Sequence, residues 1–107
     1  MKKLLFILML FSGTIFAQIE ATHFIAGWNE ANNVPWFMDL DCKTKGHTDI
    51  AKNPDIAKKY KIAVVPTIII FKDGEEALRF QADLSFKMVA TKEEVIEAID
   101  ELLMSDF

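Results

Sequence analysis

Cysteine is nearly absent from this chain of 107 residues, since Cys42 is the only one. A single cysteine excludes an intramolecular disulfide, so stability must come from packing. The nearby carboxylates of Asp39 and Asp41 disfavour the thiolate, and Lys43 and Lys45 partly offset them. We therefore expect a sluggish thiol. It is either buried and inert or available for intermolecular exchange, including a disulfide-linked homodimer.

Tracts rich in proline, glycine or serine are also missing, as are internal repeats, so the sequence shows no linker. Clusters of basic residues are scarce, with 12 Lys and Arg against 16 Asp and Glu and a formal charge of -4. Because phosphate neutralisation needs clustered Lys and Arg, nucleic acid is not an expected partner.

The longest apolar run, residues 4–11, follows Lys2 and Lys3. It is shorter than the roughly 20 residues that span a membrane. With Ala17 before Gln18, residues 1–17 predict a cleaved export signal, and an uncleaved anchor is the alternative. We expect residues 18–107 to form one domain that is periplasmic or secreted and is not stably inserted in a membrane after cleavage.

Hydrophobic patterning predicts strands over residues 19–25, near 46–50 and over 64–71, and a return strand over 77–80 after the turn at Asp73 and Gly74. Helices are expected over residues 30–40, from 54 to about 61, and from 92 to about 104. Pro35 must kink or restart the first helix. Asn29 and Asn53 are expected caps, and Thr91 opens a capping box with Glu94. This order predicts an α/β sandwich with a mixed sheet of about four strands flanked by about three helices.

Three segments resemble the thioredoxin family. Residues 24–32, FIAGWNEAN, resemble F-x-A-x-W-C-x-x-C, and residues 53–62 resemble its N-P…K-Y-x-I helix. Residues 65–67, VPT, followed by FKDGE at 71–75, resemble its I-P-T…F-K-x-G-E hairpin. The resemblance implies a trimmed thioredoxin-like fold, without the family's first strand and helix, and a cis peptide bond before Pro66.

The same alignment places Asn29 and Asn32 at the two redox cysteines of the family. Thiol-disulfide exchange needs a thiolate and a second, resolving thiol, and an amide supplies neither. We therefore expect no dithiol catalysis, no catalytic residue and no cofactor.

The surface that family members use for an extended peptide corresponds here to Trp28, Val65, Pro66 and Thr67. The leading prediction is an accessory module that binds a protein or peptide client there, although these residues could equally just preserve the fold. We expect Trp36, Phe37 and Phe86 to belong to the core.

By the resemblance, His23 and His47 fall where the family has a buried acid and its lysine partner. The pair could share a hydrogen bond, respond to pH, or bind a metal with Cys42 or Asp49. Two unrelated surface histidines are the alternative. The remaining alternatives for function are an atypical thiol-disulfide oxidoreductase acting through Cys42, and metal binding by His23 and His47.

Overall fold

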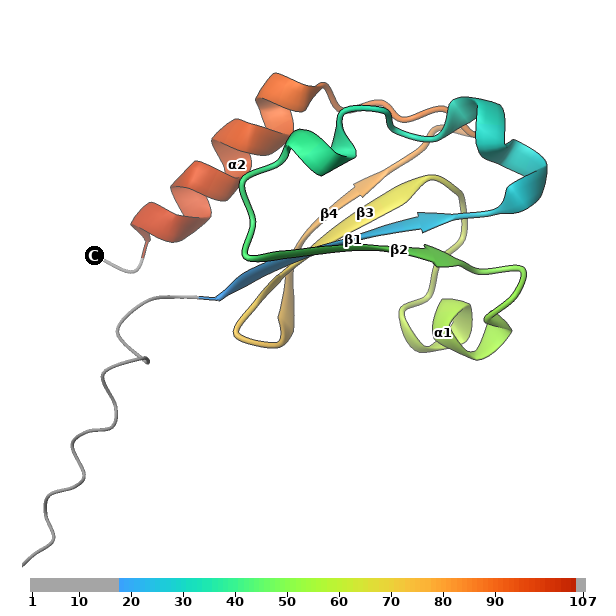
Figure 1. Cartoon of the computed structure of the whole chain (residues 1–107), viewed down its shortest axis with the longest axis horizontal. Coiled ribbons are helices and arrows are strands. Elements are labelled where there is room, and N and C mark those ends of the chain that lie inside the picture. Colours follow the sequence, from blue (N-terminus) through green and yellow to red (C-terminus); the bar gives the residue numbers. More distant parts are fainter. Residues whose placement is uncertain (1–17, 106–107) are drawn as a thin grey trace, which may run out of the picture.

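The computed structural model describes residues 18–105, so the predicted export signal lies outside the described residues. Its strands are β1 (Ile19–Ile25), β2 (Thr44–Asp49), β3 (Thr67–Lys72) and β4 (Glu75–Gln81). They form one sheet in the order β2-β1-β3-β4, in which only β1 and β2 are parallel (Figure 1). The predicted four-stranded mixed sheet is confirmed.

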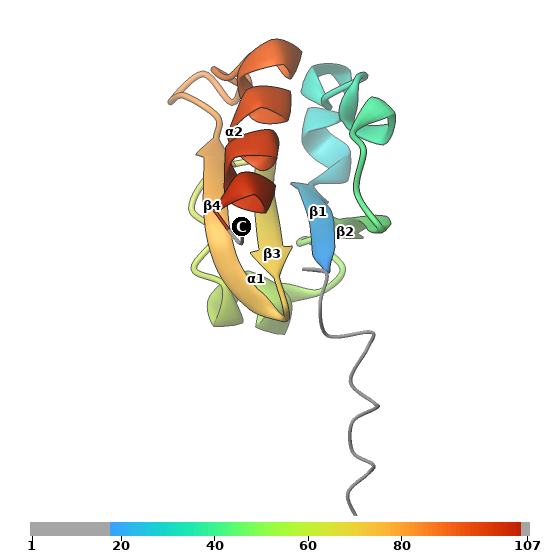
Figure 2. The same ribbon diagram turned by 90° about the vertical axis from the view of Figure 1, so that its left-hand side faces the viewer.

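Helices cover both faces of this sheet. Helix α2 (Lys92–Met104) and two 3-10 segments, η3 (Gly27–Asn32) and η4 (Phe37–Asp39), lie on one face, and α1 (Pro54–Lys59) lies on the other (Figures 1 and 2). No helix within residues 18–105 combines the length and hydropathy that crossing a membrane requires.

Strand β3 lies at the centre of the core, as its almost entirely apolar sequence predicts. Ile68, Ile69 and Ile70 have no solvent exposure. The core on the α2 side is one cluster, composed of Ile19, Ala21, Val34, Phe37, Leu40, Ile68, Ile70, Val95 and Ile99. The predicted core position of Phe37 is confirmed, and Trp36 packs against this cluster while half-buried.

The expected helix over residues 30–40 is instead the two short segments η3 and η4. Pro35 lies between them, where it has no N–H for a helical hydrogen bond. The chain turns through i to i+3 bonds, such as Asp39 N to Trp36 O at 3.0 Å. The predicted cap at Asn29 is wrong: Ala26 holds the N-cap position of η3, and Asn29 Oδ1 accepts from Asn32 Nδ2 instead of from a backbone N–H.

The caps of the two α-helices differ from each other. At α2 the predicted capping box is confirmed: Thr91 Oγ1 accepts from the Glu94 N–H at 3.1 Å, and Glu94 Oε1 accepts from the Thr91 N–H at 2.8 Å. At α1, Pro54 takes the first turn as expected. Asn53 holds the cap position, but its side chain donates to the Asp49 carbonyl at 3.1 Å instead of capping the helix.

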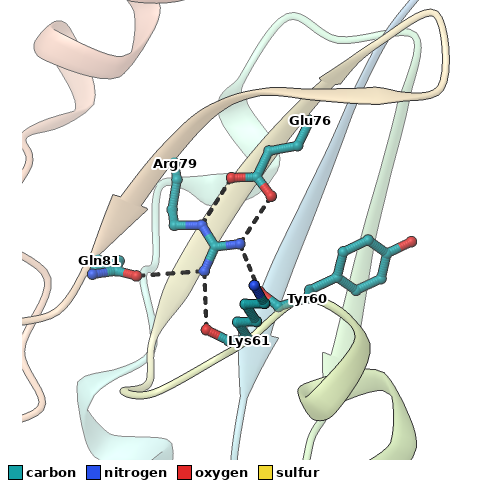
Figure 3. A network of polar contacts seen from close by, with 5 residues as sticks. All are labelled: Tyr60, Lys61, Glu76, Arg79 and Gln81. Carbon is teal, nitrogen blue, oxygen red and sulfur yellow. Dashed lines mark hydrogen bonds and ion pairs between the residues drawn. The ribbon is translucent and has the colours of Figure 1, made fainter.

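Arg79 of β4 fastens the end of α1 to the sheet (Figure 3). Its guanidinium donates to the carbonyls of Tyr60 at 2.6 Å and Lys61 at 3.2 Å, which follow α1 directly. The same group makes a two-pronged contact with the Glu76 carboxylate at 2.8 and 2.9 Å. It also donates to Gln81 Oε1 at 3.5 Å. One side chain thus joins the last turn of a short helix to an edge strand.

Candidate functional site

The two positions that would carry cysteines in the family lie together at the end of β1. Asn29 is 7% exposed, and its Nδ2 donates to the carbonyls of Val65 and Phe86, both at 3.0 Å. Its Oδ1 accepts from Asn32 Nδ2 at 2.8 Å. Both amide hydrogens of Asn29 are therefore used, and they connect η3 to two distant segments.

This arrangement supports no thiol chemistry. Asn29 and Asn32 bind each other through neutral amides, which have no accessible ionisation and are poor nucleophiles. At this end of the sheet the described residues supply hydrogen bonds and apolar surface.

Cys42 lies at the other end of β1. In the sheet register Thr44 pairs with Glu20, whereas Thr67, next to Pro66, pairs with Phe24. The thiol is half-buried and packs against the core cluster. Burial raises its pKa, Lys45 opposes the rise and Asp41 adds to it. The direction of this shift matches the predicted sluggish thiol. The position of Cys42 separates it from residues 64–66, which precede β3 and which we call the proline loop.

The four residues predicted to bind a client differ greatly in exposure. Trp28 is 65% exposed, whereas Val65, Pro66 and Thr67 are buried. The bond from Val65 to Pro66 is cis. Asn29, the residue after Trp28, donates a hydrogen bond to the Val65 carbonyl and so connects η3 to the proline loop. Val65, Pro66 and Thr67 therefore lie beneath the surface. Among the four residues, Trp28 is the one whose side chain faces solvent.

Phe86 is a site residue that the sequence reasoning placed wrongly in the core. It is 37% exposed, and its ring packs edge-to-face against Trp28 with centroids 5.1 Å apart and an angle of 89°. We call Trp28 and Phe86 the aromatic pair. The turn that presents Phe86 is held by Asp83, whose Oδ1 accepts from the N–H groups of Ser85 and Lys87 at 2.8 and 3.2 Å. Asp and Ser in this segment were the available signal for the turn.

The two histidines face each other, as the resemblance implies. His23 and His47 are partners in the β1–β2 register, and their Nδ1 atoms are 3.2 Å apart. His23 is buried and His47 is exposed. His23 Nε2 also accepts from the Val34 N–H at 3.4 Å. Because Nε2 accepts this hydrogen bond, the single proton of the neutral His23 imidazole is assigned to Nδ1. His23 Nδ1 then donates to His47 Nδ1.

This network disfavours charge and metal at His23. Burial and then the nearby His47 lower the pKa of His23 to about 4. An Nδ1 that carries a proton has no free lone pair for a metal. Among residues 18–105 there is no group of three or more His, Cys, Asp or Glu side chains that could hold a metal ion.

The comparisons with known proteins identify short sequence similarities. No family model matches the chain. It is 51% identical over 41 residues to Thioredoxin Y1, chloroplastic, of Arabidopsis thaliana, which is 38% of this chain and 24% of that protein. It is 52% identical over 27 residues to a Staphylococcus epidermidis thioredoxin, which is 25% of this chain and 26% of that one. The chain thus matches about a quarter of the length of these curated relatives.

Solved structures extend the likeness across most of the chain. A structure of thioredoxin-2, described as a component of malaria parasite protein secretion machinery, superposes with a TM-score of 0.60 at 19% identity and covers 79% of this chain and 84% of that one. A mutant thioredoxin from Halobacterium salinarum gives a TM-score of 0.54 at 22% identity and covers 82% of this chain and 74% of that one. At these identities the likeness shows the fold.

Proposed function

We propose that this protein, which is thioredoxin-like in sequence and fold, is a binding module without dithiol catalysis. Its client is an extended, apolar segment of another protein or peptide, held at Trp28 on the face that contains Pro66. The observation that supports this most strongly is the aromatic pair: two aromatic rings are exposed together where the family positions carry amides. A solvent-facing aromatic contact supplies binding energy without a reaction.

The chemistry of the site supports binding over turnover. Dithiol exchange requires a nucleophilic thiol and then a second, resolving thiol. The described residues include one thiol, Cys42, which lies at the opposite end of β1 from Asn29. No observation favours the alternative of an oxidoreductase acting through Cys42. The protonated Nδ1 of His23 likewise disfavours metal binding with His47.

The proposal includes an exported setting, either periplasmic or secreted, which rests on the export-signal pattern of residues 1–17. It includes no cofactor and no nucleic-acid partner, since the formal charge of -4 disfavours polyanions. A homodimer linked through Cys42 is compatible with it, because that thiol is incompletely buried.

Binding can be tested with reduced, carboxymethylated α-lactalbumin, an unfolded probe that has no free thiol. We expect saturable binding by fluorescence anisotropy, at least tenfold weaker for Trp28→Ala because the variant loses the exposed ring. Met104→Ala is the matched control, since Met104 is also exposed and apolar but lies at the end of α2. Absence of binding, or equal loss in the two variants, would refute the proposal.

A further inference from the structure

The carbonyls of the proline loop are already occupied inside the chain. The Val64 carbonyl accepts from Thr67 Oγ1 at 2.7 Å, and the Val65 carbonyl accepts from Asn29 Nδ2 at 3.0 Å. The Pro66 carbonyl accepts from the Ala82 N–H at 3.0 Å. A peptide that adds as a strand gains its affinity from unpaired backbone groups. Three consecutive carbonyls with internal donors leave this loop with few free acceptors for such pairing.

Asn29 is connected to both members of the aromatic pair. It follows Trp28 in the chain, and its Nδ2 holds the Phe86 carbonyl at 3.0 Å. The Phe86 backbone has a φ of 64°, in the left-handed region that is uncommon for a bulky residue. Such a conformation persists where surrounding contacts hold it, and the bond from Asn29 is one of them. The amide therefore helps to hold the backbone from which the Phe86 ring packs against Trp28.

We infer that Asn29 is a positioning residue that occupies the Val65 carbonyl of the proline loop and holds the aromatic pair in its edge-to-face arrangement. The client is consequently recognised through an apolar or aromatic side chain that packs on the pair, and strand pairing with the loop contributes little. This inference rests on the proposed function for its account of the client. The positioning role of Asn29 stands on the hydrogen bonds alone.

The test compares Asn29→Asp with the matched control Asn32→Asp. A carboxylate at position 29 keeps the shape of the side chain but cannot donate, so it faces two carbonyls with a negative charge. The control adds the same charge and loses the bond to Asn29 Oδ1, where two acceptors then face each other, but it leaves both Nδ2 donations of Asn29 in place. NMR reads the ring-current shift between Trp28 and Phe86, with the Trp36 indole as an internal reference. Anisotropy with carboxymethylated α-lactalbumin reads binding.

In Asn29→Asp we expect the Trp28 ring-current shift to fall by more than half and binding to weaken at least tenfold, with Trp36 unchanged. In Asn32→Asp we expect most of the shift to remain and binding to change less than threefold. A retained Trp28 shift in Asn29→Asp would overturn the positioning role. If Asn29→Asp does not fold, Asn29→Ser replaces it, because serine leaves one carbonyl without its donor and adds no charge.

The mode of recognition has its own readout. N-methylation of alternate backbone amides in the shortest binding segment of the probe removes strand pairing and leaves side chains in place. We expect its affinity to change less than threefold, and a loss above tenfold would overturn recognition through side chains. If the wild-type protein binds no probe, the proposed function is refuted. If Asn29→Asp nevertheless loses the ring-current shift, the positioning role of Asn29 is still supported.

Discussion

The neutral form of His23 is maintained by contacts at both ring nitrogens. Val34 donates to Nε2, and Nδ1 faces His47. Adding a proton to Nε2 would set it against the Val34 N–H, and the charged ring would lie beside Phe37 in the core. Stability should therefore depend on this residue as the pH falls.

The free energy of unfolding should decrease in acid because of His23. Its pKa is about 4 in the folded protein against 6.5 for the free side chain, so the folded state binds fewer protons between these values. The stabilisation is complete above the unfolded pKa and is lost as the pH falls toward the folded one. By this linkage about 2 kcal/mol should disappear between pH 7.5 and 5.

Urea unfolding at the two pH values measures this effect, with His23→Gln as the comparison. The variant should lose markedly less stability over the same interval, since it keeps every other titratable group of the wild type. Equal losses in the two proteins would contradict the assignment of a neutral, buried His23.

The sequence located Asn29 and Asn32 at the family's two cysteine positions but did not predict what their side chains contact. The alignment at Trp28 located Asn29 and Asn32, and the resemblance paired His23 with His47. The contact from Asn29 to Phe86 was missed because these residues are 57 positions apart and the turn depends on a left-handed backbone. Asn29 does not cap η3. Its amide instead donates to the carbonyls of Val65 and Phe86, which are long-range contacts that helix-capping rules do not include.

At the scale of elements, α1 depends on the rest of the fold. It has six residues and none is buried, and a helix of this length is unstable by itself in water. Arg79 holds the carbonyls of Tyr60 and Lys61, the two residues that follow α1 (Figure 3). The planar guanidinium reaches two carbonyls and a carboxylate together, which the point charge of lysine does not reproduce.

Arg79→Lys should destabilise the protein by about 1 kcal/mol because it removes most of these contacts. Glu76→Gln, which removes the charge of the partly exposed pair but keeps both carbonyl contacts, should cost less than half as much. Urea unfolding gives the values, and hydrogen exchange should show α1 opening first in Arg79→Lys. A larger loss in Glu76→Gln would mean that the ion pair, not the helix anchor, carries the contribution.

Helix α2 offers a second test at this scale. Thr91→Ala removes the side-chain half of the capping box, in which Oγ1 accepts from the Glu94 N–H, and should cost about 1 kcal/mol. The backbone N–H at position 91 remains to donate to Glu94 Oε1. Glu97→Ala, at an exposed position inside the same helix, is the control and should change stability by less than half of that. Thermal unfolding distinguishes them, and similar values for the two would contradict the role of the cap.

Elements with strong local signals were predicted closely. β1 has the expected bounds, and α2 follows its capping box. The segment over residues 30–40 was predicted less well. Pro35 marked an interruption, but the choice of 3-10 turns depends on how Val34 and Phe37 enter the core. β2 begins two residues before its predicted range because an edge strand of polar composition is defined mainly by pairing with β1.

At the scale of the whole molecule, the fold and the chemistry are separable. The sheet has a proline-loop end with two amides and an opposite end with the single thiol, and β1 lies between them. The thioredoxin-like arrangement depends on the packing of β3, where Ile68, Ile69 and Ile70 are fully buried, and not on thiol reactivity. The thioredoxin-like fold alone is therefore no evidence of redox activity in a chain that lacks the family's two reactive cysteines.

Reduction of insulin disulfides by the purified protein, with dithiothreitol as the electron source, decides whether this chain catalyses dithiol exchange. With amides at positions 29 and 32 and a half-buried, remote Cys42, we expect the same rate as dithiothreitol alone, and the same rate again for Cys42→Ser. Turnover above that background that disappears in Cys42→Ser would show instead that the protein is an oxidoreductase acting through Cys42.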